Sequence, residues 1–279
     1  MIKLLKRTCC AWFAVCWLVF IPALAQAQCD FSPWIGVWPE AASKTIQPKQ
    51  IFLFSGNGRG GLKSQATGLQ QFGGIIRVYL WSVHDSVNLE VLDQVISPED
   101  AQYGKYTQLL LQPSRPLLAS SEYELRASRG SENLFYLFEN KRQVSGQRGA
   151  TAYRWRTAAN PDLLAPRWTA TPAVKEKKHE ANSEGLNNYV LFTRPLLDSS
   201  QCLVRATVRH GQSGKQVMAY LTPQEQLGIG WFTCGGNVRF KSEEAYTVRL
   251  EAIDAVGNRS VASGAPIPFR APKRVHCCW

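Results

Sequence analysis

Apolar residues recur at every second position in many short runs of this chain, a period typical of β-strands that bury one face. Residues 87–91 read Val-Asn-Leu-Glu-Val and alternate strictly. Residues 246–252 repeat the pattern as Tyr-Thr-Val-Arg-Leu-Glu-Ala. Runs with a helical period are rare, so the pattern predicts an all-β protein.

Clusters of glycine, proline, serine and asparagine separate these runs, as turns between short strands do. In the first half we expect strands at residues 50–54, 75–81, 87–91, 106–112, 123–127, 135–138 and 153–155. In the second half we expect them at residues 189–193, 202–208, 216–221, 230–233, 238–240 and 246–252. Short strands at this spacing favour β-sandwiches.

A proline-containing break at residues 161–166 separates the two sets of strands. We therefore expect one sandwich domain at residues 28–160 and a second at residues 167–272, each of a size that suits a single sandwich. Residues 273–279 form a cysteine-containing tail.

Two tyrosines mark an internal repeat. Tyr123 begins Tyr-Glu-Leu-Arg-Ala and Tyr246 begins Tyr-Thr-Val-Arg-Leu, and each follows an acidic and polar turn. In immunoglobulin-like sandwiches a tyrosine at this corner returns its hydroxyl to the backbone and packs its ring in the core. We interpret both as such structural tyrosines; the alternative is that they are ordinary strand residues.

These motifs resemble those of bacterial immunoglobulin-like or fibronectin-III-like modules. The second half has the late-strand pattern of that family, at Tyr246, Val248, Leu250, Ala252, Asp254, Gly257 and Asn258. The first half has its proline-leucine turn, its Tyr-x-Leu strand and its closing aromatic-x-threonine, at Pro116-Leu117, Tyr123-Glu124-Leu125 and Trp155-Arg156-Thr157. It departs from the family's opening motif, because no asparagine follows Pro39-Glu40 before Ile51. The resemblance implies two tandem Ig-like domains of a kind that rarely carries catalysis itself.

The first residues have the pattern of a secretory signal peptide. Lys3, Lys6 and Arg7 precede an apolar run, and Ala25-Gln26-Ala27 is a small-x-small cleavage site. We expect residues 1–27 to be removed and the protein to be periplasmic or secreted, touching a membrane only through this transient segment. An uncleaved anchor is the alternative.

Cysteine use agrees with an oxidising compartment. Cys202 and Cys234 flank expected strands, and we predict that they form a disulfide. Cys29, Cys277 and Cys278 remain as free thiols, as an adjacent Cys277–Cys278 bridge or as crosslinks to another chain, and the sequence leaves these alternatives open.

Several sequence patterns that could indicate a binding or catalytic site have simpler structural explanations. Residues 56–61 match G-x-G-x-x-G, but no crossover helix follows, so we expect a loop, and Arg59 in it is a candidate partner contact. Asp254 lacks the D-x-D-x-D-G pattern of a calcium loop and predicts an Asx-type turn. We assign no catalytic, cofactor-binding or metal-binding residue. Trp34 and Trp38 close the bottom of the first sandwich, pack on the surface between the two domains, or form an exposed platform for a carbohydrate or protein partner.

The chain carries 32 basic and 21 acidic residues, a surplus that favours contact with anionic surfaces. We expect an exported, non-catalytic binding or structural module of the bacterial cell envelope that needs no cofactor. Its partner would be a protein or an anionic envelope polymer, including polysaccharide, bound through loops and sheet edges, rather than nucleic acid. A secreted hydrolase or accessory domain, and a disulfide-linked assembly subunit, are the alternative hypotheses.

Overall fold

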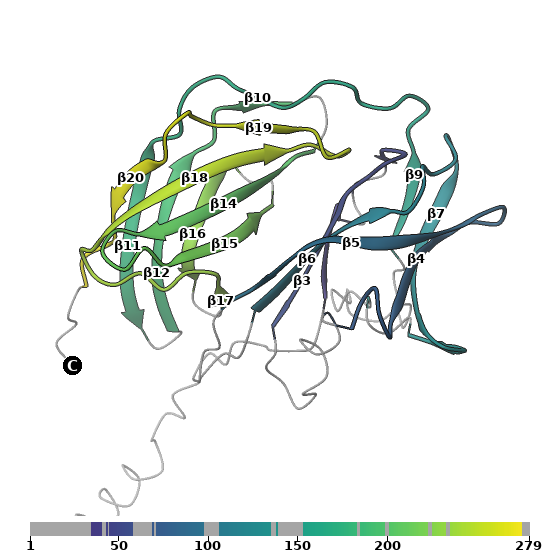
Figure 1. Ribbon diagram of the computed structural model, residues 1–279, viewed down its shortest axis with the longest axis horizontal. Helices are drawn as coiled ribbons and strands as arrows, with labels where there is room; N and C mark the ends of the chain where they lie inside the picture. The colour runs from purple at the N-terminus through teal and green to yellow at the C-terminus, as the bar shows by residue number, and fades with distance from the viewer. Residues whose placement is uncertain are drawn as a thin grey trace, which may run out of the picture.

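Among the described residues, the regular secondary structure consists almost entirely of β-strands (Figure 1). The computed structural model describes residues 35–40, 43, 45–57, 69, 71–97, 106–134, 138, 153–182, 185–198, 201–222, 225–232 and 235–274. The all-β class predicted from the alternating pattern is confirmed.

The N-terminal unit, residues 35–157, is one sheet folded onto itself. Its strands lie in the order β1-β3-β6-β5-β4-β7-β9-β2, and β8 extends β7. Their bounds are β1 Gly36–Trp38, β2 Thr45–Ile46, β3 Phe52–Asn57, β4 Arg77–Trp81, β5 Ser86–Ile96, β6 Tyr106–Pro113, β7 Glu122–Arg129, β8 Glu132–Asn133 and β9 Arg154–Thr157. The first residues of β5 pair with β4 and its later residues pair with β6, with a register shift between Val91 and Asp93. This long strand therefore links two facing layers.

The core between these layers contains the apolar residues that alternate along the strands. Phe52 and Trp155, from opposite layers, pack with ring centroids 5.4 Å apart. Leu109, Leu125 and Tyr123 belong to the same buried cluster. The period of two seen in the sequence has its cause here, since every second side chain of each strand enters this core.

The C-terminal unit, residues 167–271, consists of two main sheets. One has the order β11-β12-β16-β17, and the other has the order β15-β14-β18-β19, with β20 also paired to β18. Their bounds are β11 Val174–Asn182, β12 Gly185–Thr193, β14 Leu203–His210, β15 Gln216–Leu221, β16 Gln226–Phe232, β17 Gly235–Gly236, β18 Ala245–Ile253, β19 Arg259–Val261 and β20 Ile267–Arg270. A short pair, β10 Arg167–Trp168 with β13 Leu196–Leu197, lies beside them. Val190, Phe192, Val208 and Val248 share the core between the two main sheets.

The pattern of alternation missed β11, which has the sequence Val-Lys-Glu-Lys-Lys-His-Glu-Ala-Asn. This strand pairs only with β12 among the described strands, so it is an edge strand. Lysines on an exposed edge oppose pairing with another chain. The run of charges at residues 175–178 is therefore part of the protected border of a sheet.

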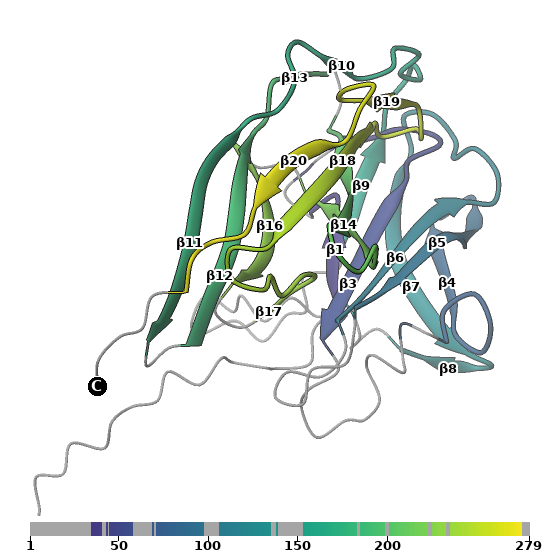
Figure 2. The same cartoon turned by 60° about the vertical axis from the view of Figure 1, so that its left-hand side comes forward.

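The two units pack directly against each other (Figures 1 and 2). A third buried cluster joins them and contains Trp38, Ile51, Leu53, Val95 and Leu110 from the N-terminal unit with Leu203, Tyr220 and Ile253 from the C-terminal unit. The Ile51 amide also donates a hydrogen bond to the Ala255 carbonyl at 2.7 Å. The outer layer of each unit thus supplies one wall of a shared junction.

Candidate functional site

The junction exists because two strands of the N-terminal unit are apolar on both faces. In β3, Phe52 and Phe54 enter the core of their own unit, whereas Leu53 between them faces the C-terminal unit. In β6, Leu109 and Leu110 divide in the same way. A continuous apolar run in a strand indicates burial on both faces, so residues 50–54 and 109–111 carried a signal for this contact.

Hydrogen bonds between polar groups fix the relative position of the two units at this junction. Gln108, only 2% exposed, donates from Nε2 to the Tyr220 carbonyl at 2.7 Å and accepts from the Tyr220 amide at 2.9 Å. This side chain therefore satisfies both backbone groups of Tyr220 on the outer edge of β15. The Tyr220 hydroxyl donates to Asp93 of β5. Because buried polar groups must be paired, these bonds specify one relative placement of the two units.

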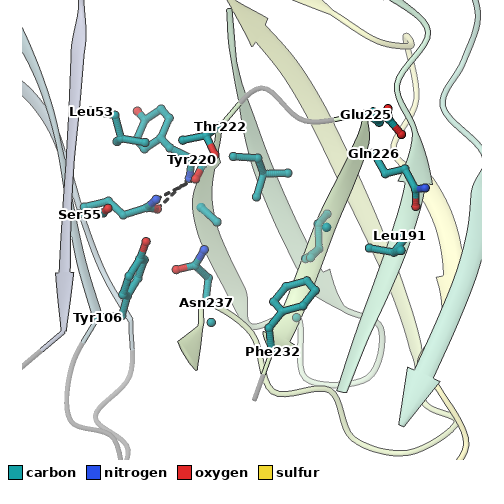
Figure 3. A pocket seen from close by; sticks show the side chains of 17 residues that line it. Leu53, Ser55, Tyr106, Leu191, Tyr220, Thr222, Glu225, Gln226, Phe232 and Asn237 are labelled. Carbon is teal, nitrogen blue, oxygen red and sulfur yellow. Dashed lines mark hydrogen bonds between the residues drawn. The ribbon is translucent and has the colours of Figure 1, made fainter. Parts of the chain in front are cut away.

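A groove of about 690 Å³ opens beside this junction (Figure 3). One wall comes from β3 and β6, and the other comes from β15, β16 and β17. Figure 3 shows Ser55 and Tyr106 on the first wall and Phe232 and Leu191 on the second. Grooves between packed units are frequent ligand sites, so we take this one as the candidate functional site.

Glycines shape the wall formed by β16. A Cβ atom added to Gly228 would lie 2.8 Å from Cζ of Phe232, so the ring lies over a residue without a side chain. Gly230 has φ of +138°, and a Cβ there would lie 2.4 Å from the Asn188 carbonyl oxygen. The Phe232 ring also stacks on Tyr189, with centroids 4.7 Å apart and an interplanar angle of 16°. The Phe232 ring therefore occupies the space that a side chain at residue 228 would need.

The edge of β16 is only partly covered. β17 pairs with Trp231 and Phe232, and the Asn237 amide donates to the Gly230 carbonyl at 3.2 Å. Alternate residues of a strand direct their backbone groups to the same side, so the N–H and C=O of Gly228 face this side as well. That side lines the groove and pairs with no described strand at Gly228.

Two further acceptors in the groove are unsatisfied. The Gln226 Oε1 and Asn237 Oδ1 atoms are buried, and neither has a hydrogen-bond partner among the described residues. Burying an acceptor without a donor costs free energy. A ligand that supplies N–H or O–H donors would therefore complete this site.

The tyrosines of the groove act as neutral groups. Burial raises the pKa of Tyr106, and hydrogen bonds with the Ser55 and Gln108 side chains oppose that shift. Burial, followed by the hydrogen bond to Asp93, raises the pKa of Tyr220 well above its usual range. Both phenols therefore keep their protons at neutral pH and can serve in hydrogen bonding.

Both predicted corner tyrosines have the same contact with the backbone. The Leu118 amide donates to the Tyr123 hydroxyl at 3.0 Å, and the Lys241 amide donates to the Tyr246 hydroxyl at 3.0 Å. In each case the amide lies five residues before the tyrosine. Ser120 and Glu243, three residues before each tyrosine, also share positive φ angles of 54° and 59°. This is the geometry that the corner interpretation predicts.

The corner at Tyr123 has an additional ionic partner. Its hydroxyl donates to Asp85 Oδ2 at 2.8 Å, and Asp85 also forms an ion pair with Arg115. The hydrogen bond from Arg115 lowers the pKa of Asp85, and the bond from Tyr123 acts in the same direction against the cost of burial. The turn between β4 and β5 is thus tied to β7.

Asp254 forms the turn that its sequence predicts. Its Oδ1 accepts from the Val256 amide at 2.9 Å and from the Asn258 amide at 2.8 Å, while Oδ2 accepts from Asn258 Nδ2 at 2.7 Å. The side chain is fully buried, and this burial raises its pKa. Asp254 is therefore a buried turn residue.

Trp38 is not part of an exposed partner platform, which corrects one of the interpretations of this residue. It is 5% exposed and belongs to the cluster between the two units. Its place in the short β1, whose partner β3 faces the C-terminal unit, could not be inferred from its spacing alone.

The other residues named from the sequence are mostly outside the described residues: Trp34, Arg59, Cys29, Cys234, Cys277 and Cys278. Cys202 is fully buried, and an Arg194 amino group lies 3.5 Å from its Sγ. Burial raises the pKa of this thiol. Cys202 is a free cysteine in the structure and Cys234 lies outside the described residues, so the structure does not support the predicted bond between them, which stays a prediction.

Within the described ranges, no group of three or more histidine, cysteine or acidic side chains is arranged to hold a metal ion. The same part of the chain contains no helix long and apolar enough to cross a membrane. No protein-family model matches the chain, and no curated protein sequence matches it.

Proposed function

We propose that this chain is an exported, non-catalytic binding protein of two Ig-like modules, which recognises an extended segment of a protein partner in the groove between them. The N-terminal cleavage pattern supports export to the cell envelope. The groove between the two units supports a binding function, because grooves between packed units are frequent ligand sites. The partner is identified by its chemistry, a polypeptide strand that offers backbone donors and acceptors.

The strand order supports the Ig-like assignment of the N-terminal unit. When the two-residue strands β2 and β8 are left out, its first, second, fifth and fourth strands form the layer β1-β3-β6-β5, and β4-β7-β9 form the other. Immunoglobulin domains have this arrangement, with strands A, B, E and D opposite C, F and G. The parallel pairing of β2 with β9 extends the second layer.

The C-terminal unit has a related connectivity. Strands β11, β12 and β16 form one layer, and β14, β15 and β18 with β19 and β20 form the other. The fourth strand, β15, pairs with β14 rather than with β16. This placement supports the fibronectin-III-like variant of the sandwich that the motif around Tyr246 resembles.

One observation carries the proposed mode of binding: the edge of β16 at Gly228 faces the groove without a partner strand among the described residues. An extended peptide adds to such an edge through main-chain hydrogen bonds, and pockets select its alternate side chains. The Phe232 ring and the unsatisfied acceptors of Gln226 and Asn237 would contact those side chains.

Selection of peptides on the purified protein tests this mode. A peptide selected from a random library is resynthesised with single backbone N-methyl groups, and its affinity is measured by calorimetry. Strand addition predicts that methylation at alternate positions weakens binding at least about tenfold, whereas methylation at the intervening positions has little effect, because every second N–H faces the β16 edge.

A paired set of variants locates the binding in the groove. Gly228→Pro removes the N–H that faces the groove and should abolish binding, while an edge position can tolerate proline without loss of the sheet. Gly228→Ala, which brings the same Cβ against the Phe232 ring but keeps the N–H, is the matched control and should still bind. Binding that survives in Gly228→Pro, or selection of saccharides rather than peptides on a glycan array, would overturn the proposal.

A further inference from the structure

A second cavity, of about 510 Å³, lies at the end of the C-terminal unit where β14 meets β15. Its interior is formed by Val208 and Val217, which are paired across these two strands, and by Val238, Tyr246 and Trp231. Val208, Val238 and Tyr246 also belong to the buried core of this unit. The cavity is therefore an apolar recess that extends from the end of the sandwich core.

The mouth of this recess is cationic. Lys215, Arg239 and Lys241 line it and are exposed, and no acidic side chain of the described residues does so. The Arg239 guanidinium carbon lies 4.2 Å above the Trp231 ring centroid, so this charge is held at the rim. The nearby Glu244 is engaged with His210 and lies 3.8 Å from the Lys241 amino group. Among the described residues, Glu244 is the acid that lies beside this rim.

We infer that this recess binds an amphiphilic anion, a molecule with an aliphatic tail and a carboxylate head. The valines and aromatic rings would remove the tail from water, which is favourable in proportion to the apolar area buried. Lys215 and Lys241 would bind the carboxylate, and charge-assisted hydrogen bonds are stronger than neutral ones. A neutral ligand would leave the cationic rim unused, and a small hydrophilic anion would leave the apolar interior unfilled.

This site differs from the groove proposed for peptide binding. The two cavities share only Gly236 and Asn237 in their walls among the described residues. The groove has an open strand edge and neutral polar groups, whereas the recess has an apolar floor and a basic rim. The inference therefore does not depend on the proposed function.

Calorimetric titration of the full-length mature protein with three ligands of equal tail length tests the inference. Decanoate should bind, decan-1-ol should bind at least about tenfold more weakly because it lacks the charge, and decyltrimethylammonium should not bind detectably. Raising the salt concentration should weaken decanoate binding, since exposed charges are screened. Acetate, which has the head without the tail, should not bind.

Variants separate the two halves of the site. Lys215→Gln combined with Lys241→Gln should weaken decanoate binding about tenfold and leave decan-1-ol binding unchanged. Val217→Trp should fill the recess and abolish both. Lys175→Gln, at an exposed lysine of β11, is the control and should behave as the wild type. Circular dichroism checks that each variant is folded.

Three results would overturn the inference. The first is the absence of decanoate binding at millimolar concentration. The second is equal affinity for decanoate and decyltrimethylammonium. The third is decanoate binding that is unchanged in the folded Lys215→Gln and Lys241→Gln double variant or in folded Val217→Trp.

Discussion

Gln108 is the residue whose replacement most directly tests how the two units are joined. Its amide makes two hydrogen bonds to the backbone of Tyr220, at 2.7 and 2.9 Å, across a separation of 112 residues in the chain. Both residues are only 2% exposed. Gln108→Leu keeps the approximate size of the side chain and removes both bonds, so the Tyr220 N–H and C=O become unpaired without access to water.

The size of the effect follows from this burial. Each buried backbone group left without a partner costs roughly 1–3 kcal/mol, so two cost about 2–6 kcal/mol. Burial of the leucine side chain returns about 1–2 kcal/mol. We therefore expect Gln108→Leu to lower the free energy of unfolding by about 2.5 kcal/mol, the difference between the midpoints of these two ranges.

Equilibrium unfolding in urea, followed by tryptophan fluorescence and by far-ultraviolet circular dichroism, measures this change. The wild type should unfold with coincident transitions in the two signals, because the shared core makes the units cooperative. The variant should show a lower midpoint and transitions that separate as the units uncouple.

Gln112→Leu is the matched control on the same strand. Gln112 is partly exposed, and its Nε2 donates only a long bond of 3.4 Å to the Lys49 carbonyl. Its replacement should change the free energy of unfolding by less than about 0.5 kcal/mol. Equal effects of the two substitutions, or an unchanged midpoint for Gln108→Leu, would refute the role given to the Gln108 bonds.

Three further predictions concern the corners, the pH dependence and the cysteines. Tyr246→Phe should lower the free energy of unfolding by about 1–2 kcal/mol in urea titrations, because a corner amide loses its acceptor; no loss would contradict the corner interpretation. The pKa of Asp85 is held below its ordinary value of 3.8 mainly by the hydrogen bond from Arg115, so its contribution to stability is complete above that value and disappears as the pH falls through the lowered pKa. Asp85→Asn should therefore be less stable at pH 7 and lose less stability below pH 4, and parallel acid-denaturation curves would count against this. For the bond between Cys202 and Cys234, peptide mapping of non-reduced periplasmic protein should find the two peptides linked, and alkylation of both thiols without reduction would exclude it.

Most strands of both cores could be predicted from the sequence, because their side chains alternate between core and solvent and the period is local to each segment. The corner at Tyr246 and the turn at Asp254 could be predicted for the same reason. Their hydrogen bonds join residues no more than five positions apart. A short motif contains all the groups that such a contact needs. The strand expected at residues 238–240 is wrong, and β20, whose Phe269 lies in the second core, was missed.

The charged strand β11 and the short strands β1 and β2 could not be predicted in this way. β11 is exposed along most of its length, so no apolar period marks it, and its place is set by backbone pairing with β12. β2 has only two residues and pairs in parallel with β9, which is more than a hundred residues away in the chain. Pairing between distant backbones leaves little trace in local composition.

The sequence by itself determined the strand-rich class, the repeated corners and the division into two sets of strands, because each depends on residues close together in the chain. Only the tertiary structure decided that Trp38 is buried, that Gln108 joins the units, and that the β16 edge faces a groove. The physical reason is that a junction depends on which outer faces meet. The local sequence does not reveal whether a glutamine is exposed or buried between two units. Only the groups that form hydrogen bonds with its amide, which come from a distant part of the chain, distinguish the two cases.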